Sequence, residues 1–188
     1  AASFFNERQR VEIGLVKVLE KNEIFNIGTN GEIKNISFAL FAAEEIVSAS
    51  GTSIPADGLI EIITLNEDGT AKIKTDLPIG NYYVKELAAD EHYILSDTKY
   101  PVNFEYAGQD TATVKIDANN GKTIENDLIY GSVSGKKVDE NGNAIGGALI
   151  GIFRTSDGGF TKENALMTTV SAEDGSFSFE NIPFGTWY

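Results

Sequence analysis

Three residues that lie far apart in the sequence, Lys17, Glu86 and Asn126, carry side chains suited to a condensation reaction. An uncharged ε-amine is a nucleophile, and a carboxamide is an acceptor that loses ammonia when an amine replaces its nitrogen. An uncharged carboxylic acid can polarise the amide carbonyl and shuttle a proton. Burial favours the uncharged forms of both amine and acid. If the fold gathers these groups in its core, the expected product is a Lys17–Asn126 amide formed with Glu86 as the catalyst.

The strand patterns around two of these residues place charged groups among core residues. Lys17 alternates with Ile13 and Leu15, and Glu86 follows Val84 by two residues, so each charged side chain shares the face of apolar neighbours. A buried charge is unfavourable unless it becomes neutral or finds a partner. The two unusual positions therefore predict that Lys17 and Glu86 meet inside the fold.

The composition favours an all-β fold to position these groups. Short β-branched runs are separated by Asn-Gly and Asp-Gly turns, and the chain of 188 residues contains 19 glycines. In an antiparallel sandwich the first and last strands can lie side by side, which would bring Lys17 to Asn126. We expect one or two helical turns over 42–48 and a hairpin of the strands at 102–106 and 111–116. Strands are predicted over 11–18, 36–41, 59–65, 71–75, 82–86, 102–106, 111–116 and 123–126.

The sequence repeats itself. Asn6 precedes Lys17 by eleven residues, and Asn126 precedes Lys137 by eleven, with an offset of 120 between the copies. We therefore predict the end of a preceding repeat or a linker at 1–10, a complete domain at 11–130 and the front part of a second domain at 131–188. Lys137 would be the crosslinking lysine of the second repeat, and Asn6 the asparagine of the preceding one. The glutamate of the second repeat is expected beyond residue 188.

Charge and composition argue against several classes of function. The net charge of −13 disfavours binding to nucleic acid or to anionic membrane surfaces, and no apolar run of about 18 residues predicts a membrane span. There is no cysteine, and His92 is the single histidine, so we expect no metal site and no cofactor. His92 itself is predicted to be a loop residue.

The motifs together resemble the Cna B-type, or prealbumin-like, domains of Gram-positive surface proteins. The likeness rests on Lys17-Val18, the strand at 36–41, Leu77-Pro78-Ile79-Gly80-Asn81-Tyr82-Tyr83-Val84-Lys85-Glu86, and Ile124-Glu125-Asn126. The chain departs from the family at 89–93, where the family usually has Ala-Pro-x-Gly-Tyr, and at Leu19, where it tends to have Asp. The resemblance implies tandem Ig-like or prealbumin-like antiparallel sandwiches, the second one incomplete.

In that family a lysine and an asparagine form a spontaneous isopeptide bond with a glutamate as catalyst. The resemblance thus implies a crosslink of Lys17 with Asn126, a single-turnover autocatalytic reaction and not an enzyme, in a stalk segment of a cell-wall-anchored adhesin or pilin outside the cell. Its partners would be neighbouring repeats of the same chain.

Two other interpretations stay open at this point. Lys17 and Glu86 could form a buried ion pair without reacting, or the chain could be a ligand-binding adhesin domain that recognises a host matrix protein or a glycan. An enzyme with turnover is disfavoured, because the sequence offers no exposed catalytic triad or metal set.

Overall fold

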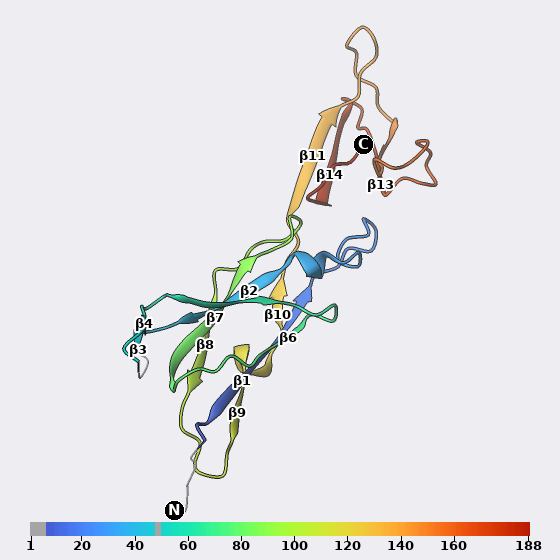
Figure 1. The fold of residues 1–188 in the computed structure, drawn as a ribbon. Coiled ribbons are helices and arrows are strands. Elements are labelled where there is room, and N and C mark those ends of the chain that lie inside the picture. The colour runs from blue at the N-terminus through green and yellow to red at the C-terminus, as the bar shows by residue number, and fades with distance from the viewer. Residues whose placement is uncertain (1–6, 48–49) are drawn as a thin grey trace, which may run out of the picture. The chain divides into compact units, whose positions relative to one another are not determined.

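The computed structural model describes residues 7–47 and 50–188, and it confirms the predicted all-β class (Figure 1). The chain divides into two compact units. Unit 1 runs to Glu20 and resumes over Gly28–Asp127, whereas unit 2 takes Lys21–Ile27 and Leu128–Tyr188. The repeat boundaries that we placed at residues 10 and 130 stay a prediction, and Asn6 lies outside the described residues.

One sheet of unit 1 is built around its first strand, β1. The C-terminal half of β1 pairs in parallel with β10 and its N-terminal half with β9, while β6 pairs antiparallel on the other side. Two strands that come late in the unit thus share one edge of β1. The strands of this sheet are β1 (Arg10–Leu19), β6 (Thr70–Ile73), β9 (Thr113–Asp117) and β10 (Ile124–Asn126).

The second sheet of unit 1 is antiparallel, in the order β5-β2-β7-β8. A separate short hairpin, β3 with β4, and two 3-10 helices complete the described part of this unit. The bounds are β2 (Ser37–Ala42), β3 (Ile46–Val47), β4 (Ser53–Ile54), β5 (Leu59–Thr64), β7 (Gly80–Ala88), β8 (Lys99–Phe104), η1 (Glu32–Asn35) and η2 (Ala118–Gly121).

The core of unit 1 lies between these two sheets, because both contribute buried side chains with the two-residue period of a strand. β1 presents Ile13 and Leu15 from one side, and β7 presents Tyr82 and Val84 from the other. Lys17 and Glu86 continue these same two rows, as the alternation predicted. Both therefore enter the core from opposite sheets.

Two expectations about secondary structure were wrong. The strands near 102–106 and 111–116 do not form a hairpin, since β8 pairs with β7 in one sheet and β9 pairs in parallel with β1 in the other. The loop between them crosses from sheet to sheet and supplies the partner for the N-terminal half of β1. The helical turn expected over 42–48 is absent from the described residues there, because the β-branched pair Ile46 and Val47 extends as β3.

Unit 2 contains two antiparallel strand pairs, β11 with β14 and β12 with β13. A bulge between Gly131 and Val133 shifts the register of the first pair. The aromatic ring of Trp187 packs edge-on against Phe25 at 4.7 Å between ring centres. The bounds are β11 (Tyr130–Lys136), β12 (Leu149–Ile152), β13 (Met167–Val170) and β14 (Ser176–Pro183).

Candidate functional site

Lys17 is buried near the end of β1, with 2% of its surface exposed. Its ammonium nitrogen Nζ donates to the carbonyl oxygens of Val18 and Ile124, each at 3.1 Å, and to Oδ1 of Asn126 at 2.8 Å. These three acceptors match the three protons of an ammonium group. The side chain is therefore held in place through its reactive atom.

Asn126 reaches Lys17 because of the register between β1 and β10. In this parallel pair Lys17 lies opposite Ile124, and Asn126 follows Ile124 by two residues on the same face of the strand. The N–H of Glu20 donates to the backbone oxygen of Asn126 at 3.0 Å, which fixes the end of the ladder. The amide is 3% exposed. First and last strands thus lie side by side as expected, and their parallel direction sets the contact.

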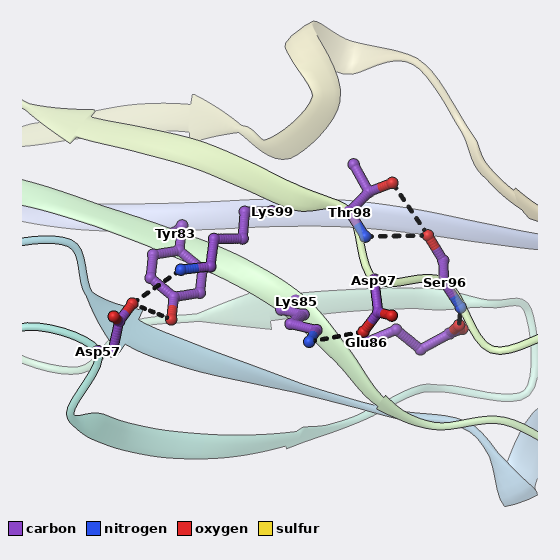
Figure 2. Close-up of polar contacts among 8 residues, drawn as sticks. All are labelled: Asp57, Tyr83, Lys85, Glu86, Ser96, Asp97, Thr98 and Lys99. Carbon is purple, nitrogen blue, oxygen red and sulfur yellow. Dashed lines mark hydrogen bonds and ion pairs between the residues drawn. The ribbon is translucent and has the colours of Figure 1, made fainter.

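Glu86 approaches the same amide from the facing sheet. Nδ2 of Asn126 donates to Oε1 at 2.9 Å and to Oε2 at 3.0 Å, and the backbone N–H of Ser96 donates to Oε2 at 2.9 Å. Figure 2 shows the contact between Glu86 and Ser96. The carboxylate is 2% exposed. The structure therefore brings all three predicted side chains together, with the amide of Asn126 between the lysine and the glutamate.

The orientation of the Asn126 amide differs from the chemistry expected from sequence. We expected the acid to polarise the amide carbonyl, but Glu86 contacts the amide nitrogen, and Lys17 contacts the carbonyl oxygen. An ammonium group can only donate and a carboxylate can only accept. The Asn126 amide therefore directs its oxygen at Lys17 and its nitrogen at Glu86, because the flipped amide would place donor against donor and acceptor against acceptor. The acid is thus adjacent to the atom that would leave as ammonia.

Burial makes Lys17 a better nucleophile than an ordinary lysine. Loss of solvent lowers the pKa of its ammonium from 10.5 to about 8, although the negative charges of Glu86, Glu125 and Asp127 act in the opposite direction. At pH 7 about a tenth of a group with this pKa is the neutral amine, which is roughly 300 times the neutral fraction at the ordinary value. Within the described residues every buried side-chain nitrogen and oxygen has a hydrogen-bond partner, so the site is fully satisfied.

A glycine turn holds the backbone of Lys17, and unit 2 repeats it at Lys137. The N–H of Lys17 donates to the oxygen of Gly69, and that of Lys137 to the oxygen of Gly175, each at 2.8 Å. Both glycines have a φ of 79°. The two lysines therefore have equivalent backbone positions. Their side chains differ, because Lys137 is exposed and its Nζ donates to the Val138 oxygen at 3.2 Å; its crosslinking role stays a prediction.

No pattern in the sequence indicates a role for Ser96, because its contribution is a backbone N–H. The pattern Ser96-Asp97-Thr98 indicates a local turn but does not indicate which carboxylate that N–H meets. His92 lies in a turn, where its Nδ1 is 2.6 Å from Oδ1 of Asp90. Over the described ranges 7–47 and 50–188, no group of three His, Asp or Glu residues is arranged to hold a metal ion. None of the helices found there has the length and hydrophobicity needed to cross a bilayer.

Comparison with known proteins finds one matching family model and a related surface protein. The sequence model of the family described as SpaA, prealbumin-like fold domain, matches residues 21–125 and again residues 131–188. The trypsin-resistant surface T6 protein of Streptococcus pyogenes serotype M6 is 35% identical over 133 residues, which cover 68% of this chain and 23% of that protein. The chain thus spans about a quarter of the length of this relative.

Solved structures with a similar fold have lower sequence identity. The Bacillus anthracis TIE protein matches with a TM-score of 0.58 and 19% identity, over 95% of this chain and 27% of that one. The C-terminal fragment of the pilus adhesin SpaC from Lactobacillus rhamnosus GG matches with a TM-score of 0.50 and 14% identity, over 96% and 73% of the two chains. At these identities the likeness concerns the fold alone.

Proposed function

Because the chain belongs to the SpaA prealbumin-like fold domain family, we propose that it is a structural stalk segment of a surface pilus or adhesin of a Gram-positive bacterium, stabilised by an amide bond between Lys17 and Asn126. Membership confirms the prealbumin-like resemblance drawn from the sequence. The observation that carries the crosslink is the buried contact of 2.8 Å between Lys17 Nζ and Asn126 Oδ1, with the Glu86 carboxylate on the amide nitrogen.

The proposed reaction begins with a proton transfer. A proton passes from the Lys17 ammonium to the Glu86 carboxylate, which leaves a neutral amine and a neutral acid; the lowered pKa of Lys17 favours this step. The amine then attacks Cγ of Asn126. Glu86 delivers its proton to Nδ2 and receives one from the attacking nitrogen. The Cγ–Nδ2 bond breaks, ammonia leaves, and a Cγ–Nζ amide remains. Holding the groups in contact supplies the entropic part of the barrier.

A covalent link at this position suits a load-bearing role. It joins β1, the first strand of unit 1, to β10, its last strand, so a pulling force that enters at one and leaves at the other passes through the bond. Neighbouring repeats of the same chain would be the mechanical partners, and the location would be the bacterial surface, anchored to the cell wall. Binding of a host matrix protein or a glycan stays the alternative interpretation of the sequence.

The test is an intact mass of the purified chain combined with a tryptic digest. The wild-type chain should be lighter than its sequence by one ammonia, and one peptide pair should contain Lys17 joined to Asn126. Glu86→Ala should have the full mass for its sequence while the β-sheet signal in circular dichroism is retained. A wild-type chain at full mass would refute the crosslink and leave a hydrogen-bonded buried cluster in its place.

A further inference from the structure

The segment Tyr93–Ser96 contacts the surroundings of all three groups in the proposed reaction. Three residues after Lys17 in the sequence, the backbone oxygen of Glu20 accepts a hydrogen bond from the hydroxyl of Tyr93 at 2.8 Å. Next to Asn126, the N–H of Ile94 donates to the backbone oxygen of Asp127 at 3.1 Å. The third contact is direct, because the N–H of Ser96 donates to the Glu86 carboxylate. We call Tyr93–Ser96 the strap.

The strap is fixed at its first end by the buried residue Asp90, whose backbone oxygen contacts the strap and whose carboxylate contacts its neighbours. Asp90 is 7% exposed and accepts hydrogen bonds from Nδ2 of Asn35 at 2.6 Å and from the N–H of His92 at 3.1 Å. The backbone N–H of Tyr93 donates to the backbone oxygen of Asp90 at 3.0 Å, so Asp90 connects the strap to the contacts that its carboxylate makes.

The strap is fixed at its other end by contacts on the β7–β8 side of the unit, which Figure 2 shows. Oγ of Ser96 accepts a hydrogen bond from the N–H of Thr98 at 3.3 Å, and Lys85 pairs with Asp97 at 2.8 Å. Lys85 precedes Glu86 on β7, so the same short piece of strand carries the catalyst and holds the segment that contacts it. The N–H of Ser96 is thereby kept over the carboxylate.

We propose that the strap is a positioning element for the crosslinking reaction and that the Ser96 N–H is its essential group. The terminal torsion of a glutamate side chain is broad, so contacts must fix the plane of the carboxylate. Ser96 occupies Oε2, which leaves Oε1 as the oxygen that carries the proton, 2.9 Å from the leaving nitrogen of Asn126. This inference rests on the proposed crosslink between Lys17 and Asn126.

The test measures the rate of ammonia loss. Chain synthesised and kept in urea, where the reacting groups do not meet, is diluted into buffer, and the fraction lighter by one ammonia is followed by mass spectrometry. Ser96→Pro removes the N–H and should slow the reaction about 10- to 100-fold. Ser96→Ala keeps the N–H and loses the Oγ contacts with Thr98, so it should react more slowly than wild type but severalfold faster than Ser96→Pro. Leu95→Pro places the same ring one residue earlier and should also stay close to the wild-type rate.

Stability is measured separately so that misfolding is not mistaken for lost positioning. Ser96→Pro is combined with Glu86→Gln, which cannot react, and its melting temperature is compared with that of Glu86→Gln alone. We expect the two melting temperatures to differ so little that the double variant is still folded at the temperature of the rate measurement. As a second variant, Tyr93→Phe removes the hydroxyl that donates to the backbone oxygen of Glu20 and should slow the reaction severalfold.

The outcomes separate the two proposals. If wild type never loses ammonia, the proposed crosslink fails. If wild type reacts and Ser96→Pro reacts equally fast, or Leu95→Pro is equally slow, the positioning role of the Ser96 N–H is refuted while the crosslink stands. If Ser96→Pro is unfolded, a wild-type rate in Tyr93→Phe refutes the strap, and a reduced rate with an unchanged melting temperature supports it.

Discussion

Glu86→Gln should lower the stability of unit 1 by about 5 kcal/mol, because it would prevent the proposed crosslink without changing the size of the side chain. The bond would join residues 109 positions apart. In the chain-entropy treatment of cross-links, closing a loop of this length restricts the unfolded chain by about 5 kcal/mol. For a domain of this size the loss corresponds to a drop in melting temperature of roughly 20 °C.

A second variant separates the crosslink from local damage. In Glu86→Gln one carboxylate oxygen is replaced by an NH2 group, so either the Asn126 amide or the Ser96 N–H loses an acceptor. In Lys17→Met the three oxygen atoms that accept from the Lys17 ammonium lose their donor. These local effects differ, but both variants would lack the same proposed bond between Lys17 and Asn126. A shared loss of about 5 kcal/mol therefore belongs to the bond, and any difference between the variants belongs to the local contacts.

Calorimetry can follow both units, and the single tryptophan identifies one of them. Trp187 belongs to unit 2, so its fluorescence marks the unfolding of that unit. We expect this transition to be the same in wild type and in both variants, while the other transition moves to lower temperature. Suppose wild type is lighter by one ammonia and yet both variants melt within a few degrees of it. The chain-entropy argument would then be wrong for this fold.

Two further predictions concern the lysine and the turns that hold it. The proposed reaction needs the one proton that passes from Lys17 to Glu86, and burial lowers the pKa of Lys17 to about 8, so the rate of ammonia loss after refolding should change little with pH below 8 and fall as the pH rises above it; a rate that keeps rising above pH 8 would refute the transfer of this proton to Glu86. Gly69→Ala should destabilise unit 1, and Gly175→Ala unit 2, by about 2 kcal/mol or more, because each glycine has a positive φ and an added Cβ would lie 2.1 or 2.5 Å from a lysine backbone oxygen. Trp187 fluorescence should report only the second of these changes.

The positions of Lys17 and Glu86 could be predicted because a strand has a fixed period. Once Ile13 and Leu15 are in the core, the pleat forces Lys17 onto the same face, and Val84 does the same for Glu86. Asn126 could be placed by the internal repeat. For Lys17 and Glu86 local geometry determines the face on which the side chain lies, whereas the contact of Asn126 with Lys17 depends on the long-range register of β1 with β10.

The sheet pairing and the Ser96 contact could not be predicted, because they depend on the path of the chain. Whether β9 continues from β8 as a hairpin or crosses to β1 is decided by long-range pairing, and both choices satisfy the same alternation of apolar residues. The Ser96 N–H is chemically the same as any other backbone N–H. Its role exists only because the 89–98 segment is anchored over Glu86.

The equivalent turns at Lys17 and Lys137 separate the placement of a lysine from its reaction. In both units the lysine N–H bonds to a turn glycine at 2.8 Å, yet one side chain is buried and the other is exposed. The backbone turn therefore fixes the position of the lysine backbone. The reactivity of the Lys17 side chain depends on the groups around it, which are Asn126 from β10 and Glu86 from the facing sheet. In unit 1 those groups bury an ammonium whose pKa is already lowered, so its charge opposes folding at neutral pH. An amide bond at Lys17 would remove that charge permanently. The unfavourable free energy of burying the charged lysine would then favour formation of the crosslink.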